Sequence, residues 1–155
     1  MNNGASLEAE LRAMIAEGDR ELAKLCERSV QKAVDAGVAT AKSTKKYTDR
    51  TGNLTRSIDG RVTSVGERSA TGVFEATAPH AIYVDGGTKP HVIRPKNGPY
   101  LVFPGKGGGM VFAREVNHPG TKPEWFFERG AEAAERVLEA SVDEGITHIE
   151  TVMTR

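Results

Sequence analysis

The sequence predicts an α+β protein, with a long helix first, short strands in the middle and a second helix near the end. Apolar and small residues recur at steps of three and four over residues 7–45 and again over residues 123–142. This is the period of a helix with one buried stripe. Between the two helices, residues 54–117 contain short alternating runs separated by turn-forming glycines and prolines, a pattern typical of strands and hairpins.

The first helix, expected over residues 7–45, is unusually long for a chain of 155 residues. A stripe of this length must cover something equally long, so we expect it to lie against a sheet, a second helix or a neighbouring subunit. Its members include Val30 and Cys26, and Gly18 and Gly37 mark bends or points of close packing. The only cysteine therefore has a packing role rather than a nucleophilic one.

The middle of the chain is expected to form hairpins. Residues 66–69 form a turn between two strands, and Asn97-Gly98 is a strong hairpin signal between two further runs. The last run, Met110–Ala113, could pair back. The expected extended runs are residues 59–65, 71–76, 81–85, 91–94, 100–103 and 110–113.

The second helix is expected to begin at Pro123, because proline fits the first helical turn and Glu124 suits the positive end of the helix dipole. Trp125 and Phe126 would open its apolar stripe. Residues 143–155 are expected to be a tail that is partly ordered or completed by a partner. The length fits a single domain over residues 1–155.

Composition excludes several classes of protein. The chain has 21 basic and 21 acidic residues, so a generally basic nucleic-acid binder is not expected. One cysteine rules out an internal disulfide and favours a reducing compartment. No apolar run approaches the roughly 18 residues needed to span a bilayer, and the first residues lack a secretion-signal pattern. We therefore expect a protein that folds in the cytosol.

The zero net charge conceals a basic middle between two acidic ends. Residues 1–41 carry five basic and seven acidic side chains, and residues 42–122 carry thirteen and six. Residues 123–155 carry three basic and eight acidic side chains. Two interpretations remain open: parts of one fold attract each other, or neighbouring copies in an assembly make charge-matched contacts.

No pattern for catalysis or metal binding emerges. The sequence contains neither a nucleophile elbow nor a phosphate-binding loop. Its four histidines, at positions 80, 91, 118 and 148, are not spaced with other ligands on a helix as metal sites require. Two turn motifs remain, Tyr83–Thr88 and His118–Pro123, in which glycine supplies positive φ and proline stiffens the approach. Their purpose is geometric, because neither presents a nucleophile with a base.

Three motifs in order carry a resemblance to a known family. Thr51-Gly52-Asn53-Leu54 with Ser57-Ile58 comes first, Tyr83-Val84-Asp85-Gly86-Gly87-Thr88 second, and His118-Pro119-Gly120-Thr121-Lys122-Pro123 third, before aromatic residues that open a helix. Over residues 5–140 the chain resembles the small neck or tail-completion proteins of long-tailed bacteriophages, also labelled head–tail connector or minor tail proteins. The family more often has Tyr-Val-Glu-x-Gly-Thr in the second motif and Arg-Pro-Phe after the third. These departures leave the fold expectation intact and obscure the phage lineage.

The resemblance implies an antiparallel β-sheet packed by the long N-terminal helix and the C-terminal helix, and a non-enzymatic protein without a cofactor. It also implies a homo-oligomeric ring, a hexamer, at the head–tail junction of the virion, assembled from subunits made in the host cytoplasm. Expected partners are a neighbouring connector or stopper ring and the tail tube protein, with genomic DNA passing through without specific binding. Whether the ring is a tail terminator or lies between head stopper and tail tube stays open.

By analogy with the family, the two turn motifs would fix sheet corners and contacts between subunits. The loop at residues 96–109 would reach a neighbouring ring or subunit. The interface and structural residues expected on this basis are Tyr83, Asp85, Gly86, Gly87, Thr88, His91, His118, Pro119, Gly120, Thr121, Pro123, Trp125 and Phe126.

Two alternatives belong to other classes of protein. A stand-alone nucleic-acid-binding domain would use the basic middle, with phosphate contacts from basic side chains but few aromatic residues for base stacking. A small hydrolase or metal enzyme is the other. The basic residues proposed for phosphate contacts are Lys45, Lys46, Arg50, Arg56 and Arg61.

Overall fold

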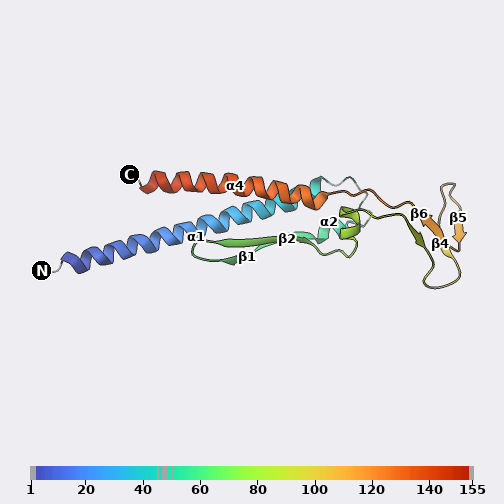
Figure 1. Ribbon diagram of the computed structural model, residues 1–155, viewed down its shortest axis with the longest axis horizontal. Coiled ribbons are helices and arrows are strands. Elements are labelled where there is room, and N and C mark those ends of the chain that lie inside the picture. Colours follow the sequence, from blue (N-terminus) through green and yellow to red (C-terminus); the bar gives the residue numbers. More distant parts are fainter. Residues whose placement is uncertain (1–2, 45, 47–48, 50, 154–155) are drawn as a thin grey trace. The chain divides into compact units, whose positions relative to one another are not determined.

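The computed structural model describes residues 3–153 apart from residues 45, 47, 48 and 50. It confirms the α+β class, with long helices at both ends of the chain and short antiparallel strands between them (Figure 1). The elements are α1 (Asn3–Ser43), α2 (Asn53–Ser57), β1 (Ile58–Val65), β2 (Ala70–Ala76), α3 (Ala81–Asp85), β3 (His91–Ile93), β4 (Leu101–Pro104), β5 (Met110–Ala113), β6 (Val116–His118) and α4 (Phe126–Met153).

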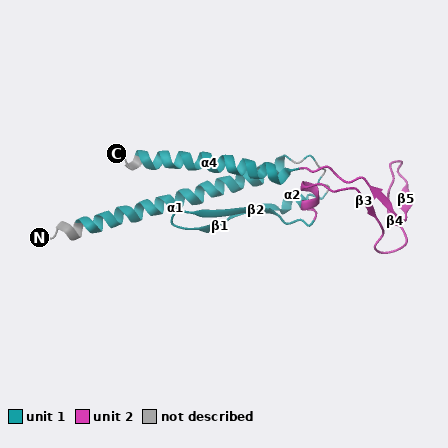
Figure 2. Ribbon diagram, viewed as in Figure 1, with its two compact units in different colours: residues 1–79, 125–155 teal, residues 80–124 magenta. Residues whose placement is uncertain are grey.

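The chain divides into two compact units where the sequence predicted a single domain over residues 1–155 (Figure 2). Unit 1 comprises residues 1–79 and 125–155, and unit 2 comprises residues 80–124. Another expectation was one sheet over residues 54–117, but the described strands form three separate two-stranded sheets, β1–β2, β3–β6 and β4–β5. A composition rich in turn residues keeps the strands of unit 2 too short to join.

In unit 1, α4 lies antiparallel along α1, and the β1–β2 hairpin also packs on α1 (Figure 1). The residues that pair α1 with α4 are mostly small. A Cβ atom on Gly37 would lie 3.2 Å from the carbonyl oxygen of Gly130, and one on Gly130 would lie 2.8 Å from that of Gly37. The two helices therefore meet backbone to backbone at this point. Phe74 of β2 lies against both glycines and stacks on Phe127, with ring centroids 4.4 Å apart.

The core of unit 1 forms where these elements meet. The long stripe expected on the first helix is buried only over its second half, against α4 and the β1–β2 hairpin. One buried polar pair joins the helices, since the hydroxyl oxygens of Ser29 and Ser141 lie 3.1 Å apart. The turn expected at residues 66–69 joins β1 to β2, and Arg68 in it pairs with Asp19 of α1 at 3.0 Å. Among the side chains of unit 1 that the structure describes, the buried apolar residues are Ala33, Val34, Ala41, Leu54, Ile58, Phe126 and Ala133.

The bounds of both long helices differ from the prediction. α1 begins at Asn3 rather than residue 7 and ends at Ser43, and the predicted end at Lys45 lies outside the described residues. α4 begins at Phe126 rather than Pro123. The reason is that Trp125 has a left-handed backbone with φ +52°, which a helix cannot include.

The predicted tail at residues 143–155 is instead helical through Met153. Gly145 falls within this predicted tail. In the structure it lies inside α4, where a Cβ atom would overlap the side chain of Leu25 on α1. Packing against α1 therefore favours continuing the helix over ending it at glycine, whose intrinsic penalty is only about 1 kcal/mol.

In unit 2, two predictions about local structure are wrong. Residues 81–85 form the short helix α3 rather than a strand, because the backbone N–H groups of Tyr83 and Val84 both donate to the carbonyl of His80. The turn at Asn97-Gly98 does not join two paired strands. β3 pairs with β6, and β4 pairs with β5. Met110–Ala113 therefore does pair back, and its partner is β4.

Candidate assembly interface

The two turn motifs predicted from the sequence meet in unit 2. Thr88 and Thr121 form an antiparallel bridge, in which the backbone N–H of each donates to the carbonyl of the other at 3.0 Å. Their hydroxyl oxygens also lie 3.1 Å apart. The bridge precedes the β3–β6 ladder, in which His91 lies opposite His118. The first and last segments of unit 2 are thereby held together.

Two glycines make this approach possible. Gly87 has φ +68° and Gly120 has φ +85°, a conformation that disfavours any residue with a Cβ atom. A Cβ atom on Gly87 would lie 2.5 Å from the carbonyl oxygen of Thr121, and one on Gly120 would overlap the carbonyl of Thr88. The sequence predicted positive φ at Gly86 or Gly87, and it falls at Gly87.

The histidines at the start of the ladder have structural hydrogen bonds. The Nδ1 of His91 lies 2.8 Å from the carbonyl oxygen of Lys89, so Nδ1 carries the proton and donates. The Nδ1 of His118 accepts from the backbone N–H of Gly120 at 3.1 Å, so its proton lies on Nε2. The rings face each other with centroids 5.1 Å apart. These contacts shape the turn at Gly120 and the strand end.

An open depression of about 510 Å³ lies beside this bridge on unit 2. Four of its five lining residues were predicted site residues, and the fifth is Lys89. Tyr83 and His91 are both exposed. A shallow hollow with an aromatic side chain and a cation suits contact with a protein surface better than enclosure of a small molecule. The residues that line it are Tyr83, Gly87, Thr88, Lys89 and His91.

The other predicted site residues have supporting positions. Asp85 is half-buried, and its carbonyl, like that of Val84, accepts a hydrogen bond from the backbone N–H of Glu124. Gly86 ends α3, donating its N–H to the carbonyl of Ile82. Pro119 and Pro123 are exposed and flank Gly120 and Thr121.

Two aromatic residues at the start of α4 have opposite surroundings. Phe126 is fully buried in unit 1 and is a core residue rather than an interface residue. Trp125 is half-exposed with its left-handed backbone, a conformation that costs about 1–2 kcal/mol for a residue with a Cβ atom. Strain of this size persists where surrounding contacts fix the backbone, so Trp125 stays a candidate contact residue.

Sequence reasoning missed an exposed apolar surface of unit 2. It lies on the β4–β5 hairpin, where Val102, Met110 and Phe112 are all exposed. The signal was present, because residues 101–103 and 110–112 are runs of consecutive apolar side chains. Such runs place apolar groups on both faces of a hairpin. The expectation that the loop at residues 96–109 reaches a neighbouring ring or subunit did not use that fact.

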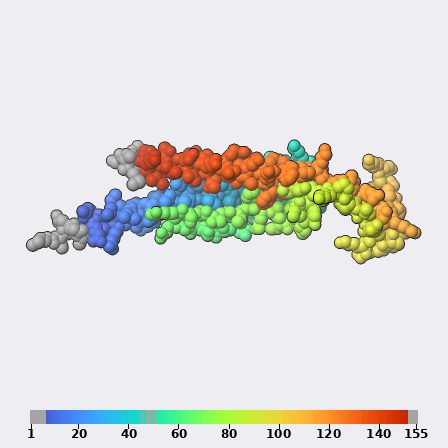
Figure 3. Space-filling view, in the orientation of Figure 1, coloured from blue at the N-terminus to red at the C-terminus, as the bar shows by residue number. Residues whose placement is uncertain are grey.

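A second exposed apolar surface lies at the N-terminal end of α1. Leu7 and Met14 are 67% and 69% exposed, and Leu11 and Ile15 are also exposed. The space-filling view shows this part of α1 projecting past the β1–β2 hairpin (Figure 3). The four residues recur at helical spacing, so they form one face. The sequence predicted this stripe, but in this chain nothing described in unit 1 buries its first part.

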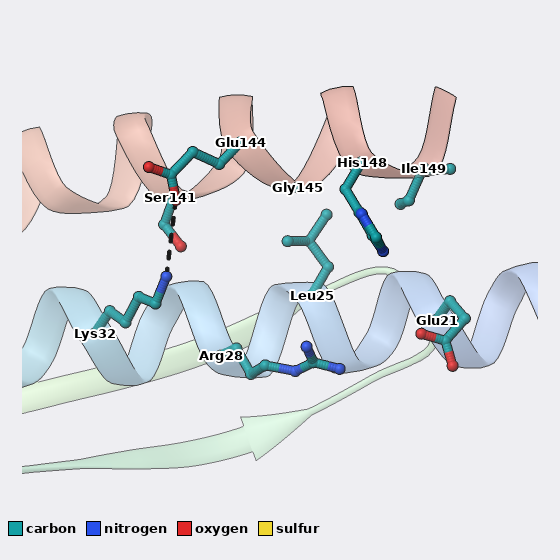
Figure 4. Close-up of a pocket in the computed structure, with 9 residues that line it drawn as sticks. All are labelled: Glu21, Leu25, Arg28, Lys32, Ser141, Glu144, Gly145, His148 and Ile149. Carbon is teal, nitrogen blue, oxygen red and sulfur yellow. Dashed lines mark ion pairs between the residues drawn. The ribbon is translucent and has the colours of Figure 1, made fainter. Parts of the chain in front are cut away.

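Between α1 and α4 lies a groove of about 200 Å³ (Figure 4). Leu25 of α1 points at Gly145 of α4, and Lys32 pairs with Glu144 at 3.9 Å. His148 points from α4 toward α1 in the same groove. An apolar contact beside a surface ion pair is typical of the interface between two packed helices.

Of the basic residues proposed for phosphate contacts, Arg56 and Arg61 bond to groups of their own chain. Lys45 and Arg50 lie outside the described residues. Arg56 donates to the carbonyl of Thr51 at 2.8 Å and to the side chain of Asn53 at 2.7 Å. Arg61 pairs with Glu75 at 2.8 Å, and this hydrogen bond raises the pKa of the guanidinium.

Over the part of the chain that the structure describes, no three His, Cys, Asp or Glu side chains gather where they could hold a metal ion. Within that same part, no helix is both long and apolar enough to cross a membrane. Comparison of the chain with protein-family models, curated proteins and solved structures found no match.

Proposed function

We propose that this chain is a structural subunit of a homo-oligomeric ring at the head–tail junction of a tailed bacteriophage. As a tail-completion, tail-terminator or connector protein, it would join the DNA-filled capsid to the tail tube. Its role there is mechanical rather than catalytic. The subunit would be made in the host cytoplasm and end in the neck of the virion.

The observation that supports assembly is the exposed apolar surface. Unit 2 has one buried apolar residue, Ala81, among its 45 residues, while both faces of its β4–β5 hairpin carry apolar side chains. Soluble monomers rarely expose contiguous apolar surface of this kind, and when they do it marks an interaction site. A subunit whose surface becomes interface in a ring has this character.

The place in the phage neck rests on the order of the three sequence motifs. The second and third motifs meet at the Thr88–Thr121 bridge. This supports the proposed place in the neck, because the bridge needs residues from both motifs. The proposed partners are further copies in a hexameric ring, an adjacent connector or stopper ring and the tail tube protein. Genomic DNA would pass through without specific binding.

The alternative, a stand-alone nucleic-acid-binding domain, has less support. Of the five basic residues it would use, Arg56 and Arg61 already bond to groups of their own chain. Binding to DNA that falls steeply with salt would favour this alternative.

The test is to delete the gene from the phage that encodes the chain and image the products. We expect filled heads and complete tails that remain separate, and joined particles again when the wild-type gene is supplied in trans. The labelled protein should map to the neck of joined particles. Joined particles without the protein, or turnover of a small substrate by the purified chain, would contradict the proposal.

A further inference from the structure

The β4–β5 hairpin presents a nearly continuous apolar face. Residues directly opposite in an antiparallel pair share a face, and Val102 pairs with Phe112 while Pro104 pairs with Met110. Tyr100 and Arg114 extend the same face, and the guanidinium of Arg114 lies 5.9 Å from the centre of the Tyr100 ring. We call these six residues the ribbon face. Phe112 on this face is 66% exposed, whereas Val111 on the opposite face is 38% exposed.

A two-stranded ribbon is marginal by itself and becomes stable when it packs against a helix. The β1–β2 hairpin shows this arrangement in the same molecule. Its inner face, which includes Ile58 and Phe74, packs on α1, and Val34 of α1 lies close to Gly72. Its outer face carries Arg61 and Glu75. The β4–β5 hairpin has the opposite pattern, because its exposed face is apolar.

Unit 2 contains no helix that could cover the ribbon face. Over residues 80–124 its only helix is α3, with five residues. A longer helical surface exists on the same chain, formed by Leu7, Leu11, Met14 and Ile15 at the start of α1. We call these four residues the N-terminal stripe.

Charge favours a contact between these two surfaces. Residues 7–21, which contain the N-terminal stripe, carry five acidic and two basic side chains, net −3. Residues 80–124 carry six basic and three acidic side chains, net +3. Complementary charge steers two surfaces together and selects their orientation, while apolar contact supplies most of the affinity. Arg114 lies at one end of the ribbon face, where it would meet the carboxylates beside the stripe.

We propose that the ribbon face of one copy packs on the N-terminal stripe of α1 in the next copy. This inference rests on the proposed function, because it names the contact that would join subunits of the ring. Two different surfaces of one chain would meet, so the contact is head-to-tail, and repeating it closes a ring when the rotation fits. The occupant of the ribbon face is therefore a second copy of this chain rather than a different protein.

A matched pair of substitutions tests the ribbon face. Val102 and Val73 are both exposed valines on two-stranded hairpins, but Val102 lies on the ribbon face and Val73 on the outer face of β2. Supplied in trans to the deletion phage, Val102→Asp should lose the joining of heads to tails, and Val73→Asp should keep it. Equal joining by both variants would overturn the proposal. Circular dichroism of the purified variants checks that each is folded.

Cross-linking in joined particles identifies the occupant. In a Cys26→Ser background, Leu11→Cys combined with Phe112→Cys should give disulfide-linked multimers of this chain after mild oxidation. The control combines Leu11→Cys with Thr63→Cys, at an exposed residue of β1, and should stay monomeric.

The results separate the two proposals. Joined particles that contain the protein but give no multimers, or that cross-link it to a different protein through Phe112→Cys, would overturn the head-to-tail contact and leave the proposed function standing. Joined particles that lack the protein altogether would overturn the proposed function.

Discussion

The β1–β2 and β4–β5 hairpins are both two-stranded antiparallel ribbons, but their apolar side chains have opposite surroundings. β1–β2 places small and apolar residues against α1 and leaves charged residues, including Arg61 and Glu75, on its outer face. β4–β5 leaves Val102 and Phe112 exposed. Unit 1 therefore completes its own core, whereas unit 2 is held by the Thr88–Thr121 bridge and short ladders. The difference is that unit 1 buries one face of its hairpin within the unit, whereas unit 2 leaves the apolar face of its hairpin exposed.

The largest expected effect comes from a charge in the core of unit 1. Val34→Asp would bury a carboxylate among α1, β1 and β2, where Val34 is 6% exposed. We expect a loss of about 3–5 kcal/mol in the free energy of unfolding, the range for an uncompensated buried charge. Chemical denaturation followed by circular dichroism measures it.

The same change on the ribbon face gives the matched comparison. Val102→Asp should alter the free energy of unfolding of unit 1 by less than about 0.5 kcal/mol, because the side chain is already in water. Equal destabilisation by Val34→Asp and Val102→Asp would mean that the ribbon face is covered within the isolated chain, and the contrast between the hairpins would fail.

An intermediate effect is expected at the glycine turns of unit 2. Gly120→Ala would place a Cβ atom against the carbonyl of Thr88 at φ +85°, and should weaken unit 2 locally by about 1–3 kcal/mol. Hydrogen exchange of residues 88–93 and 116–121 measures this opening. Gly107→Ala is the control, since a Cβ atom there would meet nothing within 4 Å. Equal protection in the two variants would argue against a structured bridge.

A smaller effect is expected where the two helices share a buried hydroxyl pair. Ser29→Ala leaves the hydroxyl of Ser141 without this partner and should cost about 1–2 kcal/mol. Adding Ser141→Ala should recover part of that loss, because no buried polar group is then left over. Denaturation of the two single variants and the double variant gives the coupling. Strictly additive losses would mean that the pair does not interact.

The smallest expected effect concerns the acidic end of α1. A hydrogen bond from Lys24, together with its charge, lowers the pKa of Glu21. Lys24→Ala should therefore raise the pKa of Glu21 toward its ordinary value, as measured by NMR titration. Because the folded-state pKa is lowered, any stabilisation is present above the ordinary pKa and lost as pH falls through the lowered one. If the pKa of Glu21 is the same in the Lys24→Ala variant, the Lys24 side chain does not bond to Glu21 in solution.

Local sequence patterns predicted the two long helices and the β1–β2 hairpin, which pack on one another within unit 1. Helical periodicity identified both long helices, and the turn at Gly66–Ser69 identified the β1–β2 hairpin. The same reasoning ended the second helix before Gly145, because propensity does not report that Leu25 packs there. Asn97-Gly98 likewise predicted a hairpin between the runs on either side of it. In the structure β3 pairs instead with β6, which lies further along the chain.

The candidate site was only partly predictable. Glycine, threonine and proline at turns pointed to the Thr88–Thr121 region, and the structure brings those residues together. The apolar runs of β4 and β5 can be read from the sequence, but their exposure cannot. An apolar run predicts burial, and only the fold shows that no described part of unit 2 provides it.

The most direct test compares hydrogen exchange of the two hairpins in the free chain and in joined particles. We predict that β1–β2, residues 58–76, is protected in both states. Residues 100–114 should exchange quickly in the free chain and become strongly protected in particles, since assembly would cover the ribbon face. If residues 100–114 exchange equally fast in both states, the β4–β5 hairpin is not an interface, which would contradict the proposed contact between copies.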